Sequence, residues 1–374
     1  MACTATRSAI GLAAATPQNL ALLLVDPARV FAHVGSDAAA WVQMAENEGV
    51  VSLLHARLNG REDVPAELQR SLTEAARMSA AYALAFQAQS RRILMQLQKT
   101  DTPVLLLKGA ALAHWAYDKP HLRSCGDVDI LLPTRHDAER LAQALAVDGF
   151  DCSSPSGGLV AYEMMCSKPM SRDWALEVDI HWQLTNSTLF ARSFDFDELM
   201  AGSQPLPNLG TNAHGLGPVH AVLHAAMHRA LNVSVGIEDR LKWQYDFIAI
   251  GGRLKPGHWS QLVSMATGKQ LAGVLLAALR SAGENFANPW PEDVMKQLEF
   301  AAQSEPLDAS RLDDWAYMQA QTMRALPGWG PKLRWLWQRV FPSRDYMTYL
   351  YGDQGSYGGL LRERLKRAWR KWRG

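Results

Sequence analysis

The chain has 374 residues, of which 48% are hydrophobic and 20% are charged. That length and apolar content allow a sizeable core and two or three domains, and they exclude a disordered chain. The 38 Lys and Arg residues nearly balance the 37 Asp and Glu residues, which excludes a net field that would draw the whole molecule to nucleic acid or to a membrane.

Cysteine usage and the N-terminus bear on the cellular setting. Cys3, Cys125, Cys152 and Cys166 include no Cys-x-x-Cys pair and are too few for a disulfide scaffold. We therefore predict reduced thiols, no zinc site on cysteine and a cytoplasmic protein. The apolar patches near the N-terminus are broken by polar residues, and no uncharged apolar run approaches the roughly 18 residues of a spanning helix. The sequence thus predicts neither export nor a transmembrane span.

The first hundred residues are predicted to form an N-terminal helical region, residues 1–100. Apolar residues recur at helical spacing from about Ala38 to Lys99, with a turn-like break at Asn59, Gly60 and Pro65.

A strand, helix, strand, helix order follows. PVLLLKG is typical of a short strand, AALAHWAYD of a helix, and DVDILLP of a second strand that ends at Pro133. Thr134 can cap a helix that runs to about Val147. Further strands are predicted around residues 159–165 and 175–184, after a Gly/Ser/Pro loop at 153–158. Residues 101–200 are therefore predicted to form a small mixed-sheet α/β core.

The remainder is predicted to be helical again. A Gly-, Pro- and Asn-rich linker, GSQPLPNLGTNAHGLGP, marks a boundary, and helices are expected at 219–250, 259–282, 291–302 and 311–324. We divide this part into a C-terminal helical domain, residues 215–330, and a basic, Trp-rich C-terminal segment, residues 331–374. The predicted class is α+β, with a mixed-sheet core flanked by N-terminal and C-terminal helical regions.

Acidic residues on two apolar strands are the main candidates for chemistry. Asp127 and Asp129 lie in CGDVDILLP, and Asp179 lies in WALEVDIHWQL. Because alternate residues of a strand share a face, Asp127 and Asp129 point the same way. The same alternation places Asp179 on one face with Glu177 and His181.

These carboxylates predict a metal site. An acid on so apolar a strand needs a partner, and hard oxygen ligands suit Mg²⁺, or Mn²⁺ in its place. Two such ions can activate a hydroxyl and stabilise a leaving pyrophosphate. Lys108 and Gly109 add a cation and a close backbone approach for phosphate oxygens. The alternative is that each acid only marks a strand edge or a turn, since an isolated Asp-x-Asp is common by chance.

The stretch LLLKGAALAHWAYDKPHLRSCGDVDILLP resembles the core of an uncharacterised nucleotidyltransferase family, a branch of the DNA polymerase β-like superfamily. The shared pattern is Leu-Lys-Gly, an aromatic residue, an Arg and then two acids on an apolar strand. The resemblance extends over roughly residues 40–365, and it is specific in the stretch from LKG to DVDILL.

This resemblance implies transfer of a nucleoside monophosphate from a nucleoside triphosphate to a hydroxyl acceptor, with release of pyrophosphate. It implies that Asp127 and Asp129 bind both metals and that Asp179 is the third carboxylate, near the attacking hydroxyl and a candidate base. The residues implied near the phosphates are Lys108, Gly109, Arg123 and Ser124. The acceptor stays open: a small molecule, a peptide, a protein, a saccharide and an RNA end are all compatible.

Two other functions are compatible with the motif. A nucleotide-sugar glycosyltransferase also uses a metal-binding Asp-x-Asp, but it needs a larger sheet before the motif, where this chain is predicted to be helical. The second alternative is a non-catalytic module of the same fold that binds a nucleotide or a partner.

Three histidines lie on one predicted helix. His220, His224 and His228 recur every four residues, and histidines at this spacing can bind zinc. No acid of the His-Glu-x-x-His kind accompanies them, so we favour packing or hydrogen bonding of His224 and His228 towards the active cleft.

Arg240 and Lys242 are candidates to bind the triphosphate or the acceptor. They follow the histidine helix in EDRLKWQYDFIAI, near Asp246. The competing interpretation is a solvated helix face with a buried ion pair at Asp246.

The C-terminal sequence LLRERLKRAWRKWRG carries seven Lys and Arg residues against one Glu. On a helix, its apolar stripe would consist of Leu361, Leu365, Ala368, Trp369 and Trp372. Such a helix suits peripheral contact with an anionic membrane or with nucleic acid. The competing interpretation is a helix docked on its own domain. Trp335 and Trp337 are predicted to be core residues.

Overall fold

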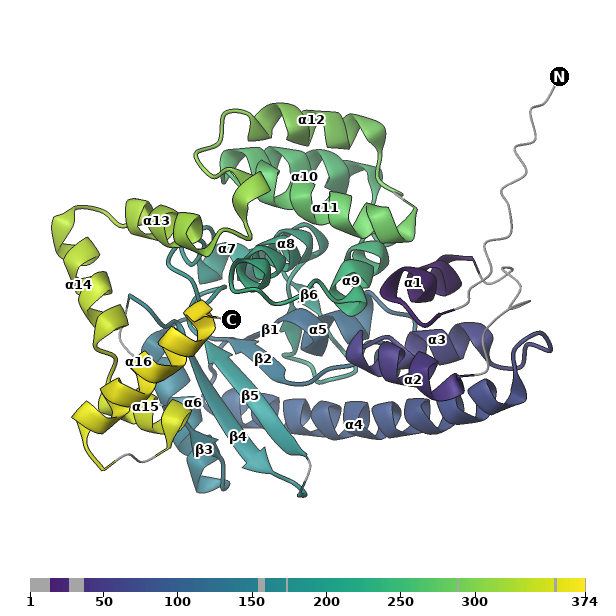
Figure 1. The fold of residues 1–374 in the computed structure, drawn as a ribbon, viewed down its shortest axis with the longest axis horizontal. Coiled ribbons are helices and arrows are strands. Elements are labelled where there is room, and N and C mark those ends of the chain that lie inside the picture. Colours follow the sequence, from purple (N-terminus) through teal and green to yellow (C-terminus); the bar gives the residue numbers. More distant parts are fainter. Residues whose placement is uncertain are drawn as a thin grey trace.

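The computed structural model describes residues 14–26, 37–153, 159–172, 174–287, 289–352 and 355–373. Cys3 and most of the predicted loop at 153–158 lie outside these ranges. Within them the chain is α+β, as predicted, with a seven-stranded mixed sheet and many helices (Figure 1). None of the described helices combines the length and the apolar character needed to cross a membrane.

The helices up to residue 201 are α1 (Pro17–Val25), α2 (Ala38–Asn47), α3 (Val51–Leu58), α4 (Ala66–Lys99), α5 (Lys108–Trp115), η1 (Pro120–Leu122), α6 (Arg135–Val147) and α7 (Phe196–Ala201). The strands are β1 (Leu105–Leu106), β2 (Val128–Leu131), β3 (Asp151–Cys152), β4 (Glu163–Pro169), β5 (Ala175–His181), β6 (Gln204–Pro205) and β7 (His214–Gly215). The later helices are α8 (Pro218–Ser234), α9 (Leu241–Gly251), α10 (Pro256–Gly268), α11 (Ala272–Phe286), α12 (Glu292–Ala302), η2 (Ala309–Arg311), α13 (Trp315–Ala325), α14 (Trp329–Val340), α15 (Arg344–Tyr351) and α16 (Tyr357–Arg373).

The sheet has the strand order β3-β4-β5-β2-β1-β7-β6. Strands β2 and β5 run parallel at its centre, and β4 lies antiparallel to β5. The segment predicted to be a linker contributes β6 and β7, so the sheet extends past residue 200. Such two-residue edge strands give no periodic signal in a sequence. The division into regions ending at residues 100, 200 and 330 stays a prediction.

Several predicted element boundaries were wrong. The strand expected at 159–165 is β4, which begins at Glu163. The helix expected at 219–250 is two helices, α8 and α9, and the helix expected at 259–282 is also two, α10 and α11. The helix expected at 311–324 is α13, which begins at Trp315. Thr134 caps α6 as predicted, its hydroxyl oxygen accepting a hydrogen bond of 3.1 Å from the amide of Asp137.

One face of the sheet is apolar and closed. Val128 and Ile130 of β2 and Val178 and Ile180 of β5 pack in one cluster with residues of α4 and α6. Alternation along the strands therefore places Asp129, Asp179 and His181 on the opposite, polar face.

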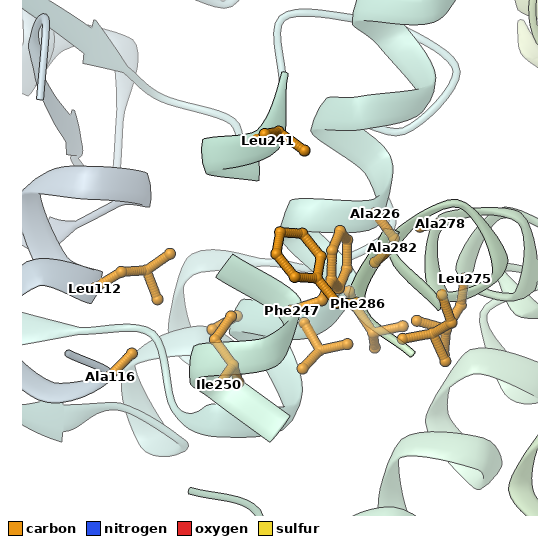
Figure 2. Close-up of a cluster of buried hydrophobic side chains, with 14 of the residues drawn as sticks. Leu112, Ala116, Ala226, Leu241, Phe247, Ile250, Leu275, Ala278, Ala282 and Phe286 are labelled. Carbon is orange, nitrogen blue, oxygen red and sulfur yellow. The ribbon is translucent and has the colours of Figure 1, made fainter. Parts of the chain in front are cut away.

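A second core holds the helical regions together beside the sheet. Figure 2 shows Phe247 and Ile250 of α9 among side chains of α5, α8 and α11, including Leu112 and Phe286. Leu112 of α5 belongs to this core, whereas Ala110 and Ala111 of the same helix belong to the sheet core. Because α5 contributes to both cores, burial of apolar area fixes α8 and α9 next to the sheet.

The C-terminal helices α14 to α16 lie beside β4 and the residues that precede it (Figure 1). Trp335 is buried as predicted, at 4% exposure, but the prediction for Trp337 was wrong, because this side chain is 64% exposed. Leu360 anchors α16, whereas Leu365 of the predicted stripe is exposed. The side chains of Ala368 and Trp372 lie outside the described part.

The prediction of reduced thiols was also wrong. Cys152 of β3 and Cys166 of β4 are directly opposite in the strand register, and they form a disulfide. Cys125 is a free thiol. The sequence separation of 14 residues between the two partners gave no signal, because nothing in the sequence predicted a β3 strand opposite β4.

Candidate active site

Two carboxylates and an imidazole meet at the centre of the polar face. Asp129 and Asp179 are register partners on the parallel strands β2 and β5, and His181 lies two residues after Asp179. Asp129, Asp179 and His181 each offer one ligand atom, and these atoms lie within 4.8 Å of one another. This group can hold a divalent metal.

Asp129 is the most constrained member of the group. Its Oδ1 accepts a hydrogen bond of 2.6 Å from Nζ of Lys108 and lies 3.1 Å from Nε2 of His181. Its Oδ2 is buried and has no hydrogen-bond partner among the described residues. A buried carboxylate oxygen without a donor is unfavourable, and a metal ion would satisfy it.

Lys108 is the first residue of α5, and its side chain reaches Asp129. Its backbone has φ of 45°, in the left-handed region that residues other than glycine rarely adopt. Burial opposes the charge of its ammonium group, but the carboxylates of Asp129 and Asp127 outweigh burial and raise the pKa of Lys108. Lys108 therefore remains a fixed cation beside the acids.

The acidic residues differ in the protonation that their surroundings favour. The charge of Asp129, together with burial, raises the pKa of Asp127 to about 6. Burial and then the charge of Asp129 raise the pKa of Asp179 to about 7. Burial also acts on Asp129, but Lys108 and His181 dominate and lower its pKa. Negative charge is thus crowded at a place where a cation would relieve it.

Asp127 lies outside that group of ligand atoms and lines a pocket next to it. This central pocket has a volume of about 250 Å³ and lies between β1, the segment before β2, and the helices α5, α8 and α9. Lys108, Gly109, Arg123, Arg240 and Lys242, all predicted to be near the nucleotide, also line it. The structure therefore brings Asp127 and five of the six predicted nucleotide contacts together.

Lys242 and Arg240 enter the central pocket from the start of α9. Neither makes an ion pair among the described residues, and both cations lie over the ring of Trp243, at 6.0 and 5.6 Å from its centroid. Burial and the nearby Arg123 lower the pKa of Lys242. The pocket thus offers cations that have no acidic partner, next to an aromatic ring that the sequence analysis did not single out.

Arg123 is engaged in a buried network behind the pocket. Its Nε and Nη2 donate to the two carboxylate oxygens of Asp246 at 2.7 and 2.8 Å, and the hydroxyl of Tyr117 donates to the same carboxylate at 2.7 Å. The buried ion pair expected at Asp246 is present. Arg123 therefore lines the pocket while its charge is already neutralised.

Gly109 and Ser124 are placed by packing. A Cβ on Gly109 would lie 2.8 Å from Sγ of Cys125 and 3.0 Å from Nη1 of Arg123. Because Gly109 has no side chain, α5 can pack against the segment that contains Arg123 and Cys125. The hydroxyl of Ser124 donates to the carbonyl oxygen of Gly49 at 2.9 Å and does not line the central pocket. Phosphate contacts by these residues stay predictions.

The three histidines of α8 do not act together. His224 and His228 line the central pocket, as predicted, while His220 packs edge-on against Phe194. Burial lowers the pKa of His224 to about 3 and that of His228 well below its usual value, so both are neutral near pH 7. Among the described residues, the group of potential metal ligands includes none of the three, which leaves the zinc alternative without support.

His181 and Glu163 are site residues that the sequence analysis did not identify. Nδ1 of His181 lies 3.3 Å from Oε2 of Glu163, near enough for an ion pair but without hydrogen-bond geometry. Burial opposes protonation of His181, but the hydrogen bond to Asp129 and the charge of Glu163 raise its pKa. The alternation that placed His181 beside Asp179 was the available signal; Glu163 comes from a strand whose register the sequence did not show.

The fold and the site together define a nucleotidyltransferase. A mixed sheet presents paired acids on adjacent strands beside a cationic pocket, an arrangement suited to metal-assisted phosphate chemistry. The model of an uncharacterised nucleotidyltransferase family matches residues 35–287, more than half of the chain, and the chain belongs to this family. No curated protein matches the chain.

Proposed function

We propose that the protein transfers a nucleoside monophosphate from a nucleoside triphosphate to a hydroxyl acceptor. The observation that carries this proposal is the meeting of Asp129, Asp179 and His181 next to a pocket that Asp127 lines and that contains cations without acidic partners among the described residues. The acceptor oxygen forms a bond to the α-phosphorus, the bond from that phosphorus to the bridging oxygen breaks, and pyrophosphate leaves.

The residues have separate tasks in this proposal. Asp127, Asp129 and Asp179 would hold Mg²⁺ or Mn²⁺, which when bound neutralises charge on the phosphates. Lys108 and His181 orient Asp129, leaving its Oδ2 free. Asp179, which does not line the central pocket, accepts the hydroxyl proton.

The triphosphate would lie in the central pocket. Lys242 and Arg240 can donate to phosphate oxygens because neither is held by a carboxylate, and Trp243 offers a surface on which a base can stack. Gly109 and Arg123 shape this pocket, and Ser124 supports it through Gly49.

A labelling experiment tests the proposed reaction. Purified protein, Mg²⁺ and cell extract are incubated with triphosphates labelled at the α-phosphorus or, in parallel, at the γ-phosphorus. We expect an acceptor product with the α label only and a loss of at least about a thousandfold in Asp127→Asn and Asp129→Asn, since metal and charge positioning supply most of the catalysis. Asp118→Asn, an exposed acid outside the site, is the matched control.

Other outcomes separate the alternatives. Unchanged labelling in both active-site variants would refute the assignment. Transfer of label from a nucleotide sugar would instead favour a glycosyltransferase, although the described chain before the motif is helical from α2 to α4. Binding of Mg²⁺ and triphosphate without any product would favour a non-catalytic module.

The proposal includes a cytoplasmic setting and a surface contact. Disulfides are rare in a reducing cytoplasm, so the disulfide between Cys152 and Cys166 argues against this setting. We also propose that the C-terminal basic helix, α16, contacts an anionic membrane surface, together with α14, because Leu365 and Trp369 of α16 and Trp329 and Trp337 of α14 are exposed among basic residues. Nucleic acid is the competing partner for this surface.

A further inference from the structure

A second cavity lies on the other side of the acids. This lateral pocket has a volume of about 520 Å³, within the range of small-molecule sites. Its floor includes Glu163 and Met165 of β4, and its roof includes Arg339 of α14, Tyr346 of α15 and Arg364 of α16. It therefore lies where the C-terminal helices approach the sheet (Figure 1).

The strand register places this pocket one strand away from Asp179. Met165 is the register partner of Asp179, which is the register partner of Asp129, so the three residues form a row across the polar face. Adjacent strands are about 4.8 Å apart. The floor of the lateral pocket thus begins about 5 Å from the backbone of Asp179, and the central pocket lies beyond Asp129 in the opposite direction. The acids separate the two pockets.

The pocket is also linked to the acids through side chains. Glu163 lines the pocket and lies beside His181, which contacts Asp129. A ligand that binds near Glu163 is therefore close to the group that would hold the metal.

Two arginines give the lateral pocket its charge. Neither Arg339 nor Arg364 makes an ion pair with an acid among the described residues. Nη2 of Arg364 donates to the carbonyl oxygen of Arg339 at 2.8 Å, so the two residues are held together. Burial and then the nearby Arg364 lower the pKa of Arg339. An anionic group of a ligand would relieve this repulsion and would take the remaining guanidinium donors.

The rest of the lining suits a hydroxyl compound of moderate size. Ser153, Glu163 and Asn186 offer hydrogen-bonding groups, while Trp315 and Leu350 offer apolar surface. All the residues supplied by α13 to α16 lie beyond residues 35–287, the part shared with the nucleotidyltransferase family.

We propose that the lateral pocket binds the acceptor, and that the acceptor is a small hydroxyl compound that carries a carboxylate or a phosphate. This inference rests on the proposed nucleotidyl transfer. Arg339 and Arg364 hold the anionic group, and the hydroxyl points along the row towards Asp179. Its oxygen bonds to the α-phosphorus of the nucleotide in the central pocket, Asp179 receives the proton and pyrophosphate leaves. The C-terminal helices then determine which acceptor this chain uses.

Calorimetric titration tests the inference without turnover. The probes are gluconate, glucose 6-phosphate and, as the neutral control, glucose. We expect at least one charged probe to bind and glucose not to bind; the two charged probes distinguish a carboxylate from a phosphate. The double variant Arg339→Gln/Arg364→Gln should weaken binding by at least about tenfold, the effect of losing one charge-assisted hydrogen bond. Arg334→Gln, an exposed arginine of α14 that does not line the pocket, should bind as the unaltered protein does.

A second variant and a second measurement distinguish the loss of a binding site from misfolding of the variant. Val160→Trp, which fills the pocket from its floor and leaves both arginines in place, should also abolish binding. Binding of a fluorescent triphosphate analogue should be the same in all variants, because the central pocket is unaltered. In the extract assay, the double variant should lose the labelled product while Arg334→Gln keeps it.

Several outcomes would overturn the inference. They are the absence of binding by both charged probes, equal binding to the double variant, and equal binding of glucose. Failure of the proposed function has a different signature, since the α label would then not be transferred even though the charged probes bind and depend on both arginines.

Discussion

Protons and metal compete for the same carboxylates. In the metal-free protein, Asp127 and Asp179 have pKa values of about 6 and about 7. Unfolded chains release these protons near pH 4, so between pH 4 and 7 the folded protein holds more protons than the unfolded chain, and a rise in pH destabilises the metal-free fold. A divalent ion must displace the same protons.

Metal affinity should therefore rise with pH. We expect the dissociation constant for Mn²⁺ to fall by about tenfold per pH unit for each displaced proton below pH 6, and to level off above pH 8. Titration calorimetry at several pH values measures it, with Asp179→Asn as the control that removes one proton from the competition. An affinity independent of pH would show that Asp127 and Asp179 do not bind the ion.

Helix α9 is joined to the segment before β2 by one buried ion pair. Arg123 and Asp246, with side-chain exposures of 5% and 6%, couple the helical region to the acidic strand. Removing one partner would leave an uncompensated charge in the interior, which is more costly than the loss of the attraction itself.

The variant Asp246→Asn should be strongly destabilised for this reason. We expect a loss of about 3–5 kcal/mol in the free energy of unfolding. The pair of Arg253 and Asp118 has side-chain exposures of 46% and 86%, and Asp118→Asn should change the free energy by about 1 kcal/mol or less. Urea denaturation of the two variants measures the difference, and equal midpoints would mean that the buried pair contributes nothing to the fold.

The C-terminal residues of the chain are basic, whereas the residues before them are acidic overall. Residues 329–374 contain eleven Lys and Arg residues and three acidic residues, a net charge of +8, whereas the whole chain has +1. The preceding residues therefore carry −7. On α14 the exposed apolar side chains recur at helical spacing, at Trp329, Leu333 and Trp337. A basic segment with such a face suits an anionic bilayer, where the aromatic rings lie at the interface.

Vesicle sedimentation tests this contact. We expect the protein to bind vesicles that contain phosphatidylserine at least about tenfold more strongly than vesicles of phosphatidylcholine alone, and salt to weaken the binding. Trp329→Ser/Trp337→Ser should reduce it, whereas Phe300→Ser, at an equally exposed apolar residue of α12, should not. Binding to RNA in place of vesicles would identify nucleic acid as the partner.

Local patterns predicted the parts of the molecule whose signal lies within a few residues. The alternation of DVDILLP and LEVDIHWQL placed Asp129 and Asp179 on strands, and the cap at Thr134 marked the start of α6. Asp127, expected on the same strand as Asp129, directly precedes β2. The sequence also predicted long amphipathic helices such as α4, because their periodicity is a local signal. The sequence did not predict the short strands β6 and β7 or the exposure of Trp337, because these features depend on neighbours that are distant in the sequence.

The sequence by itself determined the apolar and polar faces of the two acidic strands, and with them the class of chemistry. Which groups meet those acids depended on tertiary structure. The parallel register of β2 and β5 brought His181 to Asp129, the core around Phe247 placed Lys242 beside Asp127, and the path of α14 to α16 placed Arg339 over β4. Spacing along the chain encodes local geometry, whereas contacts between distant segments arise only when the whole chain buries its apolar surface.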